Sequence, residues 1–268
     1  MPPTVLVRLG RLRYSSPRLR PWLERMYRPL QNGEQTIRFG IGKGLRFDPA
    51  GGNPGYALGA IALPEQQFLA ENLRAGQTFY DIGANVGFFA VLGAKLVGPA
   101  GRVYAFEPYL ASAKAVADNA ARNGFAHVNV FNAAAGRCNG HASLLLDGTC
   151  GEFHVADGDA GDSAGRTPVS VVAIDHLVQK NECSPPHLVM IDVEGAEIDV
   201  LHGMSNTITR FRPIVVCEVH GRGDQFARAC DSLFSPANYK VTTLDGSQFP
   251  REEACRFHAL MMPIGCNS

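Results

Sequence analysis

Apolar residues along this chain occur in short runs, and most runs are followed by a segment whose apolar residues recur at helical spacing. Residues 78–87 show the pattern most clearly, because β-forming residues lead to Asp81, Gly83 and Gly87 before the helical spacing begins. This pattern predicts a buried strand, a glycine-rich turn and the start of a helix. Similar runs predict strands at residues 102–107, 128–134, 187–193, 214–220, 239–244 and 256–264.

Helical patterns between these runs predict helices at residues 64–73, from residue 107 to about residue 123, and through residue 201. Strands that alternate with helices predict an α/β fold, a mostly parallel sheet with helices on both faces, and we expect the last strand to be antiparallel. Ligands bind such sheets beyond the carboxyl ends of the strands. The polar residues expected at that edge are Asp81, Glu107, Asn132, Asp192, Glu194, Glu218 and His220.

Some segments lie outside this repeating pattern. Residues 35–48 predict a small β element, and the Gly- and Pro-rich residues 48–59 predict a loop that covers the active site. Residues 142–146 and 169–174 predict an inserted hairpin around a polar loop at residues 147–167. We interpret that loop as a lid or a substrate loop.

Residues 1–30 differ in composition from the rest of the chain. They contain seven arginines, whereas Glu24 is their one acidic residue, and apolar residues at helical spacing predict a helix. One interpretation is a basic amphipathic tether in weak contact with a membrane surface or a partner. The other, which we favour, is a helix packed on the larger domain with its arginines in solvent. We therefore expect an appendage at residues 1–59 and the main domain at residues 60–268.

Composition narrows the class of protein. The chain has 268 residues, 46% hydrophobic and 19% charged, as is typical of a globular protein. Its formal net charge of zero argues against nucleic acid as a partner. The seven cysteines include no C-x-x-C pair, which favours reduced thiols in the cytoplasm and predicts no zinc site. No apolar run reaches the ~20 residues of a membrane-spanning helix.

The glycine turn and the acidic strand ends indicate a nucleoside ligand. The dinucleotide fingerprint needs a middle glycine that residues 83–87 lack. Asp81, at the tip of its strand, would repel a pyrophosphate, whereas a cationic or amino-bearing ligand is compatible with it. Glu107, just before Pro108, is placed to bond a ribose diol. Asp81 and Glu107 thus end two neighbouring strands, and the turn is not suited to phosphate. This combination predicts S-adenosylmethionine as the cofactor.

Asn132 and Ala133 end the third strand, where they either lie beside an adenine ring or begin an exposed loop. Methyl transfer to a hydroxyl requires in-line positioning and removal of the proton. His220 is our hypothesis for the base, because a neutral imidazole accepts a proton near pH 7. Glu218 would steer it, and Asp192 is either a rival base or a carboxylate that stabilises the sulfonium. A metal held by these three residues is a further option, but no dense cluster argues for one, so no metal is predicted.

Together these motifs resemble the FkbM family of S-adenosylmethionine-dependent methyltransferases. The matching runs are Asp81-Ile-Gly-Ala-Asn-Val-Gly87, Ala105-Phe-Glu-Pro108, Ile191-Asp-Val-Glu-Gly-Ala-Glu197, and Glu218. The resemblance covers roughly residues 60–264. It implies a class I (Rossmann-like) methyltransferase fold with a seven-stranded sheet, and O-methylation of a hydroxyl on a sugar, a glycan or a polyketide-type natural product. It implies that the cofactor contacts Asp81, Gly83, Asn85, Gly87 and Glu107, with Glu65 near its methionine end.

One position departs from that family. Its strand usually reads Lys-Ile-Asp, where this chain has Met190, Ile191 and Asp192. Met190 shares a strand face with Asp192, so a positive charge expected beside that carboxylate is missing on the acceptor side. Two other classes stay open. One is a non-catalytic S-adenosylmethionine-binding module, for which Met190 is a hint, and the other is a nicotinamide-dependent oxidoreductase, which would need the missing glycine.

Overall fold

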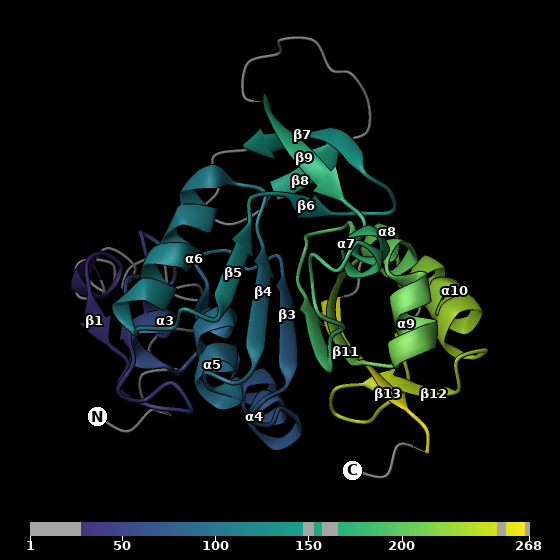
Figure 1. Cartoon of the computed structure of the whole chain (residues 1–268), viewed down its shortest axis with the longest axis horizontal. Coiled ribbons are helices and arrows are strands. Elements are labelled where there is room, and N and C mark those ends of the chain that lie inside the picture. Colours follow the sequence, from purple (N-terminus) through teal and green to yellow (C-terminus); the bar gives the residue numbers. More distant parts are fainter. Residues whose placement is uncertain (1–27, 147–152, 157–165, 251–255, 266–268) are drawn as a thin grey trace, which may run out of the picture.

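The structure is a computed structural model of the chain, and it describes residues 28–146, 153–156, 166–250 and 256–265. Within these residues, seven strands form one sheet in the order β12-β13-β11-β10-β3-β4-β5 (Figure 1). Their bounds are β3 (Thr78–Ile82), β4 (Arg102–Phe106), β5 (Val128–Phe131), β10 (Leu188–Ile191), β11 (Ile214–His220), β12 (Tyr239–Thr243) and β13 (Arg256–Pro263). Neighbours from β11 to β5 are parallel, whereas β13 is antiparallel to β11 and to β12. The predicted seven-stranded, mostly parallel sheet with an antiparallel last strand is confirmed.

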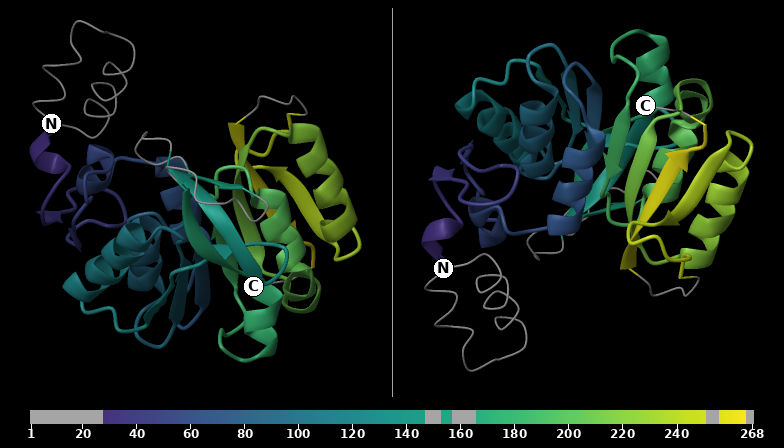
Figure 2. Two further views of the ribbon diagram at one scale, coloured as in Figure 1. Left: turned by 90° about the horizontal axis from the view of Figure 1, so that it is seen from above. Right: turned by 90° about the horizontal axis from the view of Figure 1, so that it is seen from below.

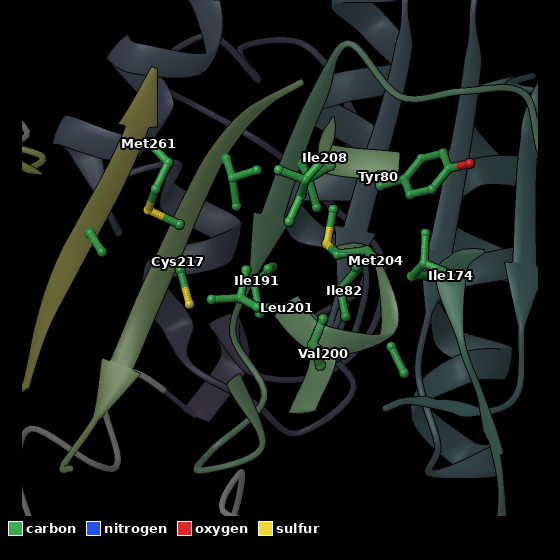
Figure 3. Packing of buried hydrophobic residues seen from close by; sticks show 14 of the residues in the cluster. Tyr80, Ile82, Ile174, Ile191, Val200, Leu201, Met204, Ile208, Cys217 and Met261 are labelled. Carbon is green, nitrogen blue, oxygen red and sulfur yellow. The ribbon is translucent and has the colours of Figure 1, made fainter. Parts of the chain in front are cut away.

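Helices cover both faces of this main sheet (Figure 2). They are α4 (Leu63–Asn72), α5 (Phe88–Val97) and α6 (Leu110–Arg122) on one face, and α7 (Ile174–Gln179), α8 (Glu197–Gly203), α9 (Ser205–Phe211) and α10 (Gly223–Phe234) on the other. Successive side chains of β3 enter different cores. Tyr80 and Ile82 pack with residues of α7, α8 and α9 (Figure 3) in a core that also includes α10, whereas Phe79 packs with α5. Because a one-residue slip would exchange the two faces, this alternation fixes the register and the position of each strand end.

A second, smaller sheet follows directly after β5 and lies above it in Figure 1. In the described residues its order is β6-β9-β7-β8, with β6 (Ala134–Ala135), β7 (Gly140–Leu146), β8 (Phe153–Ala156) and β9 (Arg166–Val172). The hairpin predicted at residues 142–146 and 169–174 is confirmed, since β7 and β9 pair antiparallel. The loop predicted at residues 147–167 is wrong where β8 pairs with β7, because a four-residue strand is too short to show its period. Residues 147–152 and 157–165 of that loop lie outside the described residues.

The segment before α4 contains short elements. These are η1 (Arg28–Leu30), β1 (Gln35–Thr36), β2 (Arg46–Phe47) and α3 (Pro54–Leu58). The predicted small β element is confirmed by the antiparallel pair of β1 and β2. The loop predicted at residues 48–59 is wrong at α3. This helix forms because Pro54 occupies its first turn and the Asn53 side chain accepts the N–H of Gly55 at 2.8 Å.

This segment shares a core with the main domain. Ile37 and Phe47 are buried in the core that includes α5, and Asn119 of α6 binds the backbone of Asp48. The domain boundary between residues 59 and 60 stays a prediction, and residues 1–27, which hold most of the predicted basic helix, lie outside the described residues. Where the chain is described, no helix has both the length and the apolar composition that crossing a bilayer requires.

Gly203 of α8 contacts the backbone that follows β6. A Cβ atom at this position would lie 1.9 Å from the carbonyl oxygen of Gly136. We expect Gly203→Ala to lower the free energy of unfolding by about 1–3 kcal/mol, because the added atom forces two backbones apart. Urea denaturation measures this loss.

The matched control is Gly140→Ala on β7, where an added Cβ atom meets nothing within 4 Å. It should change the free energy of unfolding by less than about 0.5 kcal/mol. Equal losses in the two variants would contradict the close packing of α8 on the second sheet.

Candidate active site

The carboxyl ends of the parallel strands meet in register at one edge of the main sheet. Asp81 of β3 pairs with Met190 of β10 on one side and with Ala105 of β4 on the other. A cavity of about 860 Å³ opens at this edge. The predicted site residues that line it are Glu65, Asp81, Gly83, Asn85, Glu107, Pro108, Asp192 and Glu218. The structure thus brings together side chains that are far apart in the sequence.

The turn after β3 requires glycine at residue 83. Gly83 has a φ of 85°, and its N–H donates to the carbonyl oxygen of Phe106 at 2.9 Å. A Cβ atom here would lie 1.8 Å from the carbonyl oxygen of Asp192. Any larger residue would therefore separate the ends of β3 and β10. Asn85 follows with a φ of 49°, and its N–H donates to the carboxylate of Glu107 at 2.8 Å.

Two buried carboxylates, Asp81 and Glu107, line the cavity, and each residue is 4% exposed. Burial raises the pKa of both groups to about 7, and the nearby Asp192 adds to this effect. Glu107 accepts the backbone N–H groups of Asn85 and Tyr109, both at 2.8 Å. Oδ2 of Asp81 has no hydrogen-bond partner in the described part of the chain. An unpaired buried carboxylate oxygen is costly, so the site fits a ligand that brings a cationic or N–H group to Asp81.

Three other predicted cofactor residues are absent from the described lining of the cavity. Gly87 makes room for α6, because a Cβ atom there would lie 2.9 Å from Cα of Val116. The Asn132 side-chain amide donates to two carbonyl oxygens of the turn after β4, at 3.0 and 2.9 Å. Ala133 is buried at 6% exposure. Asn132 thus supports the turn that carries Glu107. Direct contact of the three residues with a cofactor stays a prediction.

His220 lies at the end of β11 among carboxylates. Its Nε2 is 3.7 Å from Oδ1 of Asp192 and 3.6 Å from Oε1 of Glu218, and its Nδ1 is 2.7 Å from Oε1 of Glu197. Burial opposes protonation, but the hydrogen bond to Glu197 and the charges of Glu194 and Asp192 outweigh it and raise the pKa of His220. A larger fraction of this imidazole is thus protonated near neutral pH than in a free histidine. His220 itself is not among the described residues that line the cavity.

Asp192 faces the cavity from the end of β10, with a side chain that is 48% exposed. Desolvation by the cavity walls and the charge of Glu218 raise its pKa to about 7, although His220 acts in the opposite direction. The three predicted catalytic side chains therefore do come together. Their roles stay predictions.

His258 is a site residue that the sequence analysis missed. Because β13 is antiparallel, residues near its start meet the end of β11, and His258 pairs with Glu218. Its Nε2 is 3.3 Å from Oε2 of Glu218, and its Nδ1 is 3.3 Å from Oε1 of Glu65. Burial works against Glu218 as an anion, but His258 and Arg256 lower the pKa of Glu218 to about 2. The one signal for His258 was the predicted antiparallel strand.

Met190 and Tyr56 add to the cavity wall. Met190 is 8% exposed and packs in the core with α5 beside Asp192, so the wall is apolar where the resemblance led us to expect a lysine. Positive charge is supplied instead from β13, by Arg256 and His258. Tyr56 comes from α3, in the segment predicted as a loop, and burial raises the pKa of its hydroxyl well above the usual range.

The strand order, the glycine turn and the two buried acids define a class I, S-adenosylmethionine-dependent methyltransferase. Residues 81–244 match the family described as Methyltransferase FkbM domain. This match covers more than half of the chain, and the chain belongs to the FkbM methyltransferase family. The resemblance inferred from the motifs is confirmed, and the family argues against a nicotinamide-dependent oxidoreductase.

Individual relatives are distant. The hexuronic acid methyltransferase AglP of Haloferax volcanii is 26% identical over 159 residues, which are 59% of this chain and 62% of that protein. The methyltransferase FkbM of Methylobacillus flagellatus has a TM-score of 0.45 and 14% identity, over 78% of this chain and 53% of that one. An S-adenosylmethionine-dependent O-methyltransferase of Thermotoga maritima has a TM-score of 0.43 and 10% identity, over 78% and 68%. The chain thus spans less than two thirds of AglP and of the Methylobacillus protein.

Glu107 couples the stability of the fold to pH. Burial raises the pKa of Glu107 from 4.5 to about 7, so the folded chain holds this proton more tightly than the unfolded chain. The resulting stabilisation is complete below pH 4.5 and is lost as the pH rises through about 7. Asp81 acts in the same direction. We expect the free energy of unfolding of the ligand-free chain to fall between about pH 5 and pH 7, and to fall less steeply in Glu107→Gln, which cannot titrate.

Urea denaturation at several pH values measures the two slopes, independently of any constant offset that the amide introduces. Glu71→Gln changes an exposed glutamate of α4 and should keep the slope of the parent. Parallel profiles for Glu107→Gln and the parent would show that Glu107 does not titrate in this range.

Proposed function

We propose that this chain is an O-methyltransferase that transfers the methyl group of S-adenosylmethionine to a hydroxyl of a sugar-type acceptor. One observation carries the proposal: a single cavity has Asp81 and Glu107 on one side and Asp192 and Glu218, backed by His220, on the other. The first pair suits a nucleoside that carries positive charge. The second group suits a hydroxyl that must be oriented and deprotonated.

The side of the cavity formed by β3 and β4 fits S-adenosylmethionine. Each oxygen of Glu107 keeps a lone pair for a ribose hydroxyl after it has accepted a backbone N–H. Oδ2 of Asp81 and Oε2 of Glu65 are both buried without hydrogen-bond partners among the described residues, and both residues line the cavity. They suit the amino group at the methionine end. When bound, S-adenosylmethionine supplies a methyl group that its sulfonium sulfur already activates.

The acceptor hydroxyl is expected at the ends of β10 and β11. Asp192 lines the cavity directly, whereas His220 lies behind Asp192 and Glu218 with Nε2 toward both, since its Nδ1 is bound to Glu197. We keep His220 as the proposed base and Asp192 as its rival. Glu218, held by Arg256 and His258, orients this group.

A sugar acid is the acceptor class that one relative suggests. AglP of Haloferax volcanii is named as a hexuronic acid methyltransferase. An acidic sugar would meet two cationic side chains that line the cavity, Arg256 and His258, and the Arg256 side chain is 57% exposed. Hydroxyls of other sugars, glycans or polyketide-type products lie within the same proposal.

Removal of the Glu107 carboxylate should weaken S-adenosylmethionine binding. We expect Glu107→Ala to lose about 1.5–3 kcal/mol, roughly 10- to 150-fold in Kd, because a charge-assisted hydrogen bond to the ribose is lost. Isothermal titration calorimetry on the full chain measures this, with Glu71→Ala as the exposed control. Unchanged affinity in both Glu107→Ala and Asp81→Asn would overturn the cofactor site.

His220 should matter for turnover and not for cofactor affinity. We expect His220→Ala to lower kcat by about 10²-fold or more with a nearly unchanged Kd for S-adenosylmethionine. The assay follows S-adenosylhomocysteine formed with a panel of hexuronic acid and neutral sugar glycosides, and His176→Ala on α7 is the control. Full kcat in His220→Ala would exclude His220 as the base. Cofactor binding without turnover on any acceptor would favour a non-catalytic module.

A further inference from the structure

The end of β11 places an unsatisfied nitrogen among carboxylates. Nε2 of His220 is buried and has no hydrogen-bond partner in the part of the chain that the structure describes. Carboxylate oxygens surround it, from Glu194 at 3.3 Å, Glu218 at 3.6 Å and Asp192 at 3.7 Å. The candidate ligand atoms of Asp192, Glu218 and His220 all lie within 4.8 Å of one another. This nitrogen is therefore suited to a ligand that accepts its lone pair.

Glu197 fixes the orientation of the ring. Its Oε1 lies 2.7 Å from Nδ1 of His220 and also accepts the N–H of Gly195 at 2.9 Å. Glu197 is 4% exposed and lies in the first turn of α8. Because the Glu197 carboxylate accepts the Nδ1 proton, the lone pair of a neutral imidazole is on Nε2, toward Asp192 and Glu218. Histidines that bind metals are held by this same kind of contact with a carboxylate.

Carboxylates outnumber cationic groups around the cavity. In the described residues the acids are Glu65, Asp81, Glu107, Asp192, Glu194, Glu197 and Glu218, and the cationic side chains are Arg256 and, when protonated, His220 and His258. The excess remains when a cationic nucleoside occupies the side of Asp81, and in this respect the inference rests on the proposed function. Poorly solvated like charges repel one another, and a doubly charged ion offsets two of them.

We propose that Asp192, Glu218 and His220 bind a divalent metal ion beside the methyl-transfer site. The ligands are Nε2 of His220 and one carboxylate oxygen from each acid. Donor atoms bound to one ion at about 2.0–2.3 Å lie at most about 4.5 Å apart, so the observed spacing needs only a small side-chain rotation. Mg²⁺ prefers ligand sets made of oxygen alone, and Zn²⁺ prefers sets rich in nitrogen. A set of one imidazole and two carboxylates is intermediate, which makes Mn²⁺ the suitable probe.

Arg256 competes with the ion for Glu218. Its guanidinium binds Oε1 of Glu218 and lies 3.7 Å from Oε1 of Glu194. Its side chain is 57% exposed, so it can turn toward solvent with little loss of packing. His258 contacts the other oxygen of Glu218 at 3.3 Å and can stay in place. Removal of the Arg256 charge should therefore strengthen metal binding.

The ion has a direct role in the proposed reaction. Three protein ligands leave coordination positions for water and for the acceptor hydroxyl, which loses its proton more readily when bound to a metal. With the ion bound, Nε2 of His220 is a ligand and cannot also be the base, so the ion replaces the base role proposed above for His220. The proton would pass to solvent water, and the hydroxyl oxygen would form its bond to the methyl carbon. The carbon–sulfur bond breaks at the same time, and its electron pair goes to sulfur.

Titration of the full, EDTA-treated and dialysed chain with Mn²⁺ tests the site. Calorimetry, with the electron paramagnetic resonance of free Mn²⁺ as a second readout, should show one ion per chain. We expect Asp192→Asn and His220→Gln each to weaken binding by about 10-fold or more, and Arg256→Gln to tighten it. Asp199→Asn makes the same change of charge on α8, outside the described lining of the cavity, and should leave the affinity unchanged.

Absence of Mn²⁺ binding would overturn the proposal, as would an affinity that Asp192→Asn and His220→Gln leave unaltered. Thermal melts verify folding, and the half-exposed Asp192 side chain makes its variant informative even if His220→Gln fails to fold. S-adenosylmethionine binding and turnover are measured separately with EDTA present. Full turnover in EDTA would contradict the role of the ion and leave the proposed function standing. If the parent chain does not bind S-adenosylmethionine, the proposed function is contradicted instead. The Mn²⁺ titration then tests the metal site on its own.

Discussion

The site depends on one constraint: several carboxylates lie close together, and poorly solvated, at one edge of the main sheet. Parallel strands bring their carboxyl ends together, so the acids that end them share one region of low hydration. An ionised acid there is costly unless a donor or a cation meets it. The protein meets Glu107 with two backbone N–H groups and Glu218 with Arg256 and His258. Oδ2 of Asp81 has no hydrogen-bond partner among the described residues.

Two hydrophobic cores hold this arrangement in place. Phe79 and Tyr80 are adjacent in β3 and fully buried in opposite cores, so β3 cannot slip by one residue without losing both. The same register brings Asp81 level with Met190 and places the turn at Gly83 against the backbone of Asp192. Apolar packing thus supplies the rigidity that charged groups in close proximity require.

The sequence was informative wherever one regular element carried the signal. Asp81, Glu107 and Asp192 end parallel strands, so their meeting at one edge was predictable from strand periodicity. His258 was not, because it begins an antiparallel strand and reaches the edge only through its pairing with Glu218. The helix α3 and the strand β8 were missed because five and four residues are too few to show a period.

The second sheet contributes to the cavity wall but does not carry the buried acids. Ala134 and Ala135 of β6 and Leu144 of β7 form part of the cavity wall, and the chain leaves the main sheet after β5 to build them. The buried acids come instead from strand ends held between the two cores. Replacement of the second sheet would therefore reshape this part of the cavity wall and leave the buried acids in place. The shape of the cavity and the acids buried beside it are thus encoded by different parts of the chain.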